Sequence, residues 1–128
     1  MAGEAIITLQ SRYLLVNVQG DALPPKEIKQ AIFMAIKQAT KSNLNIVVLR
    51  EVFSKQRATA IDFFDCALFL TETVRQFEYR NKIALVFPQE MHNKKLDFFT
   101  DASSNRGVTI QLFSTKEEAH KWLGIDSD

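Results

Sequence analysis

The chain has 128 residues, of which 46% are hydrophobic and 24% are charged, and this composition is typical of one globular domain rather than of a disordered segment. The 16 Lys and Arg residues nearly balance the 15 Asp and Glu residues, and the formal net charge of +1 lacks the basic excess usual in nucleic-acid-binding proteins. No apolar run approaches the roughly 18 to 20 residues of a membrane helix. The single Cys66, and Glu4 in an N-terminus without a basic leader segment, predict a cytoplasmic protein with one domain over residues 1–128.

The first half of the sequence predicts a β-hairpin, a helix and a buried strand. Two runs of β-branched and aromatic residues, Ala5–Leu9 and Tyr13–Gln19, flank a short polar connection and favour paired strands. Two prolines at 24–25 then stand before a segment, 28–39, in which apolar residues recur at helical spacing opposite lysines, as in an amphipathic helix. The continuous apolar run at 45–49 is typical of a central strand covered on both faces.

A second helix and a second buried strand follow. The helix is predicted from Ala58 to about Tyr79, because its apolar residues form one stripe with i, i+3 and i+7 spacing (Ala60, Phe63, Ala67, Leu70, Val74 and Phe77). The next strand is predicted at 83–87 and ends at Pro88. This region therefore continues the alternation of helices with strands.

The last part of the sequence predicts a third helix over 89–104, closed by Gly107 in a left-handed conformation. A strand at 108–113 then leads to a final helix that Ser114 or Thr115 caps. The order is ββαβαβαβα. It predicts a single α/β domain with a mixed, mostly parallel sheet and helices packed on it.

The sequence carries no recognisable catalytic or cofactor-binding motif. Its four glycines are dispersed, whereas the dinucleotide fingerprint and the phosphate-binding P-loop need clustered glycines. The two histidines, His92 and His120, share no local catalytic signature with Cys66. Asp62 and Asp65 are three residues apart on the second predicted helix, as in many exposed acidic pairs. We therefore expect no enzyme activity, no cofactor and no metal site.

The second predicted helix carries more apolar residues than one buried stripe needs. On a helical wheel, Ile61 and Leu68 point away from the stripe and flank Asp65, while Phe69, and Phe33 of the first helix, lie on other sides. Clustered exposed apolar groups favour an interaction face, for a homodimer or a partner protein, and we name Ile61, Asp65 and Leu68 the predicted interaction face. A wider buried arc, or scattered exposed apolar residues, would produce the same pattern.

Arg106 is a candidate anion contact. It lies in the string Asn105-Arg106-Gly107, at the junction between the third helix and the last strand. Its guanidinium would suit the geometry of a carboxylate or a phosphate. The alternative is that Gly107 caps the helix while Arg106 bonds nearby carbonyl or acidic groups.

The C-terminal part of the chain resembles a known family. The string Asn105-Arg106-Gly107-Val108 is followed by Phe113, then by Glu118-Ala119 and Trp122-Leu123. With the ββαβαβαβα order, this ending resembles STAS-type domains of the SpoIIAA-like group, which includes anti-sigma-factor antagonists and sulfate-transporter tails. The resemblance covers nearly the whole chain. It implies the SpoIIAA-like fold and a non-catalytic regulatory role exerted through protein contacts.

Phosphorylatable antagonists of that group place an Asp-Ser-Ser/Thr-Gly string after the central strand, where an added phosphate blocks the interface. The corresponding region here, 50–59, lacks the Asp-Ser pair and the glycine, and its hydroxyl groups belong to Ser54 and Thr59. Thr59 fits better as a helix N-cap. We therefore predict an interaction module without a phospho-switch. If this region were phosphorylated, Ser54 and Thr59 would be the candidate sites.

The alternative function is that of a lipid-carrier-like protein with a small apolar or anionic ligand. Related lipid-binding folds share this α/β arrangement. The ten phenylalanines supply more apolar surface than is usual for a domain of this size, and some of it could line a pocket.

Overall fold

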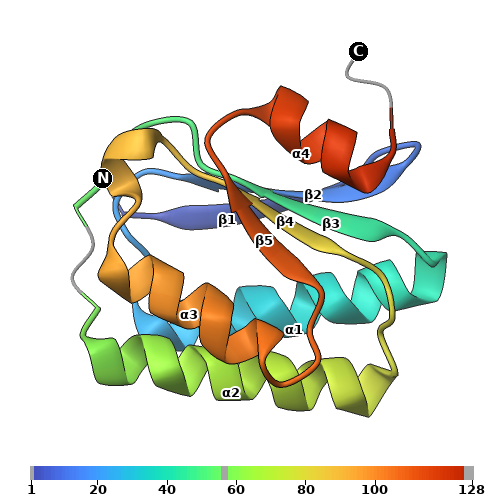
Figure 1. Ribbon diagram of the computed structural model, residues 1–128, viewed down its shortest axis with the longest axis horizontal. Helices are drawn as coiled ribbons and strands as arrows, with labels where there is room; N and C mark the ends of the chain where they lie inside the picture. Colours follow the sequence, from blue (N-terminus) through green and yellow to red (C-terminus); the bar gives the residue numbers. More distant parts are fainter. Residues whose placement is uncertain (1, 56–57, 126–128) are drawn as a thin grey trace.

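The computed structural model describes residues 2–55 and 58–125, and within them it confirms the predicted element order and the single α/β domain (Figure 1). Five strands alternate with four α-helices, and one short 3-10 helix, η1, precedes α3. In chain order the elements are β1 (Glu4–Leu9), β2 (Tyr13–Gln19), α1 (Pro25–Ser42), β3 (Asn45–Leu49), α2 (Ala60–Phe77), β4 (Ile83–Val86), η1 (Gln89–Met91), α3 (Lys94–Ser104), β5 (Ile110–Phe113) and α4 (Lys116–Leu123).

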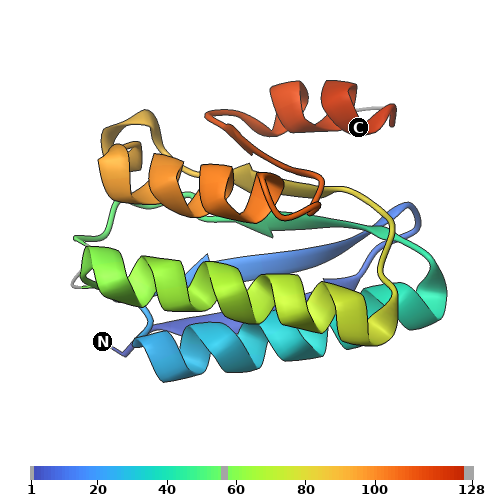
Figure 2. The same cartoon turned by 60° about the horizontal axis from the view of Figure 1, so that its bottom comes forward.

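The strands form one mixed sheet whose spatial order, β1-β2-β3-β4-β5, is the same as their order in the chain. β1 and β2 form the predicted antiparallel hairpin, with Leu9 opposite Leu14, and the remaining pairs are parallel. Because crossovers between parallel strands are right-handed, a strand order that never reverses places every crossover helix on the same face. Figures 1 and 2 show α1, α2 and α3 together on one face and α4 on the other.

Each face of the sheet has its own hydrophobic core, and the central strand β3 contributes to both. Ile46 belongs to the core beneath α1, α2 and α3, whereas Val47 belongs to the core beneath α4. This division confirms the prediction that the run at 45–49 is covered on both faces. The α4 core is the smaller and is closed by Ala119 and Leu123. Within the described residues no helix combines the length and the apolarity needed to cross a membrane.

The predicted third helix is in fact two elements. The 3-10 turn ends at Met91, the backbone is extended at His92 and Asn93, and α3 begins only at Lys94. The side-chain oxygen of Asn93 accepts a hydrogen bond from the backbone N–H of Leu96 at 2.9 Å, which satisfies one of the free donors of the first turn. A good N-cap residue inside the apolar pattern therefore interrupts the single helix that periodicity predicts over 89–104.

Gly107 closes α3 as predicted, in the left-handed region with φ of 94°. The N–H of Val108 donates to the carbonyl of Ser103 at 3.2 Å and that of Gly107 to the carbonyl of Ser104 at 3.0 Å, the two bonds of a Schellman motif. A Cβ atom at Gly107 would meet open space. The backbone conformation, rather than crowding, is therefore what favours glycine here.

Two details of the predicted helix faces are wrong. Ala60, assigned to the buried stripe of α2, is exposed in the first turn of that helix. Phe33, assigned to an exposed side of α1, is partly buried and packs edge-on against Phe77, with ring centroids 5.4 Å apart. A wheel of one helix cannot show that α2 lies alongside α1 and covers that side.

Thr59 caps α2, as predicted, through a capping box. Its hydroxyl oxygen accepts from the N–H of Asp62 at 3.1 Å, and the Asp62 carboxylate accepts from the N–H of Thr59 at 2.8 Å. We expect Thr59→Ala to lower the free energy of unfolding by about 1 kcal/mol, because one helix donor loses its acceptor. Urea denaturation measures this loss. Thr59→Ser, which keeps the oxygen, is the matched control and should differ little from the wild type.

Candidate functional site

The candidate site is a cavity of about 180 Å³ between the sheet and the layer formed by α1, α2 and α3. In many open parallel sheets the ligand crevice lies where the strand order reverses. The strand order of this sheet does not reverse, so that type of crevice is not formed. The space available for a ligand lies inside the larger hydrophobic core instead.

Aliphatic and aromatic side chains make up most of the cavity wall. The sheet contributes residues such as Val16, Val48 and Leu85, whose side chains point toward the helical layer. The opposite wall is formed by the helices, with Ala35 of α1 and Phe63 of α2 among its residues. Every strand and each of these three helices contributes at least one lining residue, so the cavity depends on the packing of the whole fold.

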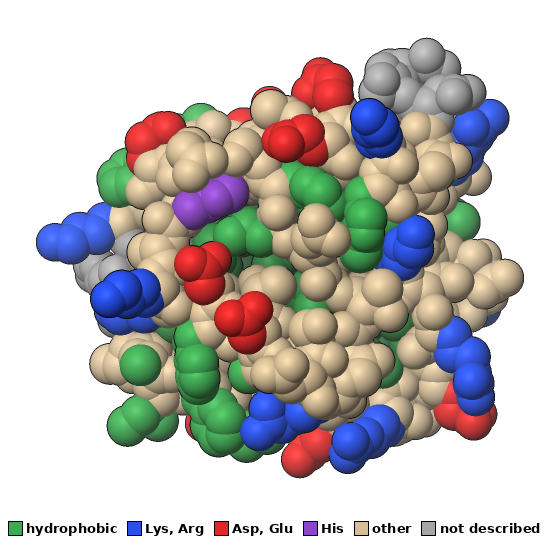
Figure 3. Space-filling view, in the orientation of Figure 1, with side chains coloured by type: hydrophobic (Ala, Val, Ile, Leu, Met, Phe, Trp, Pro, Cys, Tyr) green, Lys and Arg blue, Asp and Glu red, His purple; other side chains and the backbone are tan. Residues whose placement is uncertain are grey.

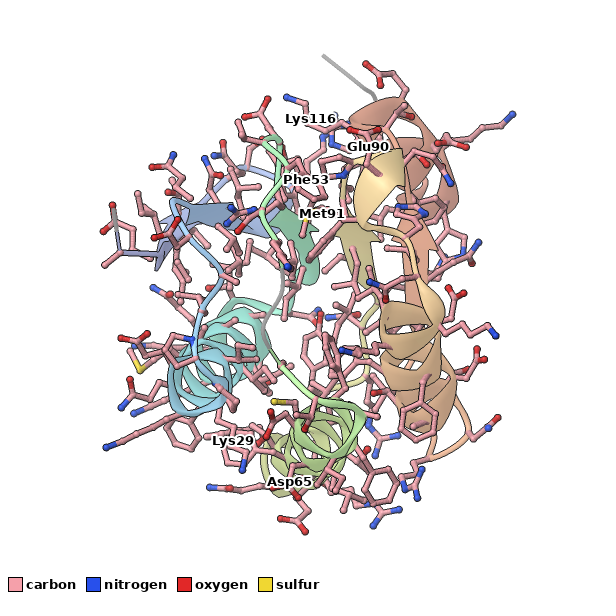
Figure 4. All side chains as sticks on the ribbon, turned by 90° about the vertical axis from the view of Figure 1, so that its left-hand side faces the viewer. Lys29, Phe53, Asp65, Glu90, Met91 and Lys116 are labelled. Carbon is pink, nitrogen blue, oxygen red and sulfur yellow. The ribbon has the colours of Figure 1, made fainter. Side chains whose placement is uncertain are left out.

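Among the described residues, few polar ones line the cavity: Arg50, Ser54 and Asp62, together with the thiol of Cys66. Arg50 and Ser54 belong to the connection that leaves β3, and Asp62 lies in the first turn of α2. Figure 4 views the molecule from this edge of the sheet. The cavity therefore has an apolar body and a polar end at the carboxyl ends of the parallel strands.

Arg50 is the most deeply buried charged residue at this polar end, with 4% of its surface exposed. Its Nε donates to the carbonyl of Val52 at 2.9 Å, and its Nη2 donates to the carbonyl of Gly20. Its Nη1 is buried, and no group within the described residues accepts a hydrogen bond from it. Burial lowers the pKa of Arg50, and the negative charge of Asp21 opposes that shift. The guanidinium thus links the connection after β2, through Gly20, to the connection after β3, through Val52, while one of its nitrogens stays unpaired within the described residues.

Cys66 lies on α2 and is 3% exposed. Burial is the main reason that the pKa of its thiol is raised, and the carboxylates of Asp62 and Asp65 act in the same direction, whereas Lys29 opposes them. The reactive form of a cysteine is the thiolate, which these surroundings disfavour. The sulfur therefore contributes to the wall of the cavity as a small apolar group.

The predicted interaction face lies on the outer side of α2, away from the cavity. Ile61 is 76% exposed and Leu68 is partly buried. The carboxylate of Asp65 lies 3.6 Å from the ammonium of Lys29 on α1, and Figure 4 shows these two side chains meeting across the helices. The three residues share one helix face, and their role in contacts stays a prediction.

Arg106, the predicted anion contact, is used locally. Its Nη1 donates to the carbonyl of Ala102 at 2.9 Å, and its guanidinium lies 5.3 Å from the ring centroid of Phe64. These are the contacts that the alternative interpretation anticipates. Of the candidate phosphosites, Thr59 is exposed but occupied by its cap, and Ser54 is partly buried in the cavity wall. Phosphorylation of either stays untested.

Neither histidine is among the residues that line the cavity. His92 is partly buried, and its Nε2 lies 3.0 Å from the carbonyl of Phe87. His120 is buried under the opposite face of the sheet, where its ring lies 5.3 Å from that of Tyr13. Among the described residues no three His, Cys, Asp or Glu side chains are grouped so that they could hold a metal ion.

The molecular surface shows no field of a single sign on the side drawn in Figure 3, where basic and acidic side chains are interspersed and hydrophobic patches lie between them. This distribution agrees with the near-zero net charge. Comparisons of the chain with protein-family models and with curated proteins gave no match.

Proposed function

We propose that this protein is a non-catalytic binding domain that holds a small, largely apolar molecule in the cavity between the sheet and α1, α2 and α3. The cavity itself is the observation that carries the proposal. Ligand sites in proteins are concave and mostly apolar, with a few convergent polar groups, and this cavity has that character.

The size of the cavity supports a ligand on energetic grounds. Protein interiors are packed as densely as organic crystals and contain few voids larger than a water molecule. A space of about 180 Å³ is therefore unusual in a domain of this size, and a ligand that fills it would supply contacts that the surrounding side chains otherwise lack.

The volume also limits the ligand. An engineered apolar cavity of about 150 Å³ stays dry and takes up benzene, which has six heavy atoms, and the cavity described here has a similar volume. We expect a ligand, or the buried part of one, with about this number of heavy atoms.

Native mass spectrometry of the purified protein, beside a denatured control, tests the proposal. We expect the native spectrum to retain a small added mass that disappears on denaturation, or the protein to take up added 1-hexanol with a measurable rise in melting temperature, because ligand binding to the folded state alone stabilises it. Absence of both effects would contradict the proposal.

A second candidate is the regulatory interaction module that the STAS-type resemblance implies. It is favoured by the exposure of Ile61, which is 76% exposed on the same helix face as Asp65. The same native spectrum reads the number of subunits. A stable dimer that Ile61→Asp converts to a monomer would support self-association through this face. A protein that stays monomeric at all accessible concentrations would contradict self-association.

A further inference from the structure

The edge of the sheet at β1 presents backbone groups that have no partner within the described residues. β1 is the outermost strand, and its neighbour in the sheet is β2. In an antiparallel pair, residues whose N–H and C=O groups bond the neighbouring strand alternate with residues whose groups point away from it. The N–H of Gln10 donates to the carbonyl of Tyr13 at 3.0 Å, which fixes the alternation. The groups of Ala5, Ile7 and Leu9 therefore point off the edge of the sheet.

This edge lacks the features that usually protect a free strand. Natural sheets protect their edges with lysine, proline, a β-bulge or a covering segment. The residues Ala5–Leu9 include no charged residue and no proline, and their register with β2 continues without a bulge. The strand also carries exposed apolar side chains, since Ile6 is 41% and Leu9 is 56% exposed. An edge of this kind favours pairing with a further strand.

A second copy of β1 matches this edge in the register that centres on Ile7. Identical strands related by a two-fold axis pair antiparallel, and opposite residues must lie on the same face of the sheet. With Ile7 opposite Ile7 of the second copy, Ala5 lies opposite Leu9 of the second copy, a small side chain against a large one. All the outward groups of these residues are then paired. A register centred on Ile6 would set Leu9 opposite Gly3, which lies outside the strand.

The remaining side chains of the strand agree with the register centred on Ile7. On the opposite face of the sheet, Ile6 lies opposite Thr8 of the second copy, so an exposed apolar side chain meets a β-branched one. Glu4, the charged residue of β1, lies opposite the neutral Gln10. No like charges therefore face each other. Because the two strands are identical, one set of contacts satisfies both copies.

We infer that two copies of this chain associate through their β1 edges to form a dimer with one continuous sheet. The two-fold axis runs perpendicular to the sheet beside Ile7, and β1 becomes an interior strand in both copies. The contact uses the backbone of the sheet edge rather than the face of α2 that carries Ile61. It also needs no ligand in the cavity, so the inference is independent of the proposed function.

The concentration dependence of the molecular mass tests the association. Because two short strands bury a small area, we expect a weak dimer with a Kd on the order of 100 μM. Sedimentation velocity of the wild-type protein should therefore show a monomer at about 10 μM and mostly a dimer at about 1 mM. A protein that stays monomeric up to about 1 mM would overturn the inference.

Leu9→Pro tests the edge, because it removes an outward N–H donor and leaves the hydrogen bonds between β1 and β2 in place. Leu9→Ala is the matched control, since it also removes the leucine side chain but keeps the N–H group. The dimer loses the donor twice by symmetry, so we expect the Kd of Leu9→Pro to exceed that of Leu9→Ala at least tenfold, on the order of two lost hydrogen bonds. Ile61→Asp should leave the Kd unchanged. Equal Kd values for the two Leu9 variants, or loss of the dimer in Ile61→Asp, would overturn the inference.

Amide hydrogen exchange of the wild-type protein, measured by NMR, tests the contact without a variant. The amides of Ile6 and Thr8 bond β2 and should stay protected at every concentration. The amides of Ala5, Ile7 and Leu9 should exchange about threefold more slowly at about 1 mM than at about 50 μM, as the fraction of monomer falls. Exchange of these three amides that does not change while the dimer forms would place the contact elsewhere and overturn the inference, even if Leu9→Pro does not fold.

Discussion

Ala35→Leu is expected to stabilise the ligand-free protein by about 1 kcal/mol and to weaken binding of small apolar ligands at least tenfold. Ala35 lies on α1, is 5% exposed and lines the cavity. The added isobutyl group would occupy space that is otherwise empty, and filling a cavity commonly stabilises a domain by about 0.5 to 2 kcal/mol. The same atoms would exclude the ligand. Urea denaturation and calorimetric titration of 1-hexanol measure the two effects.

Ala39→Leu is the matched control. Ala39 lies one helical turn further along α1 and is fully buried in the same core, but it does not line the cavity. The larger side chain would therefore be forced into packed surroundings, and we expect a loss of about 1 to 3 kcal/mol. The two substitutions are identical in chemistry and should have opposite signs. If Ala35→Leu destabilised the protein as much as Ala39→Leu, the cavity would not be available in solution.

The sequence predicted most of the fold because its local patterns agree with one another. The run at 45–49 has no polar residue except Asn45, and it forms the central strand over the same five residues. Thr59 and Gly107 mark a helix start and a helix end through hydrogen bonds that depend only on neighbouring residues. Such features can be recognised within a few consecutive residues of the sequence, and they determine the element order that the structure confirms.

The predictions that were wrong depend on contacts between distant segments or on competing local signals. Phe33 is partly buried because Phe77, 44 residues later, packs against it across the α1–α2 interface. The helix predicted over 89–104 is interrupted because Asn93 provides a cap within an otherwise continuous apolar pattern. Periodicity on its own cannot rank these effects, since it treats each helix as isolated.

The sequence suggested a pocket only through its large number of phenylalanines, and it did not indicate where that pocket lies. The cavity arises because side chains from all five strands and three helices leave space between them. No pattern within a single segment can indicate such a space. The sequence did carry a signal for Arg50, since this charged residue comes directly after the apolar residues 46–49, at the carboxyl end of a predicted central strand, where parallel sheets place functional groups. The sequence by itself marks 50–59 only as the region that lacks the phosphorylatable string. The burial of Arg50 and its unpaired nitrogen became visible only in the structure.

Tyr79 is expected to make the stability of the protein fall at high pH. Its side chain is 5% exposed, and its hydroxyl lies 3.0 Å from the carbonyl oxygens of both Leu44 and Lys82, where it joins the starts of β3 and β4. Burial raises the pKa of the Tyr79 phenol well above its ordinary value of about 10. Below about pH 10 the phenol keeps its proton in both the folded and the unfolded states, so Tyr79 contributes its full stabilisation in that range.

Above about pH 10 the unfolded state loses the phenolic proton while the folded state keeps it, so this residue lowers stability by up to about 1.4 kcal/mol for each pH unit until the folded state ionises too. Tyr79→Phe removes both the hydrogen bond and the titration. We expect it to cost about 1 to 2 kcal/mol at pH 7, because two buried carbonyls lose their shared donor. The gap between Tyr79→Phe and the wild type should then narrow, and even change sign, as the pH rises from 10 to 11.5. Urea denaturation across this range measures it, and a constant gap would show that Tyr79 ionises equally in the two states.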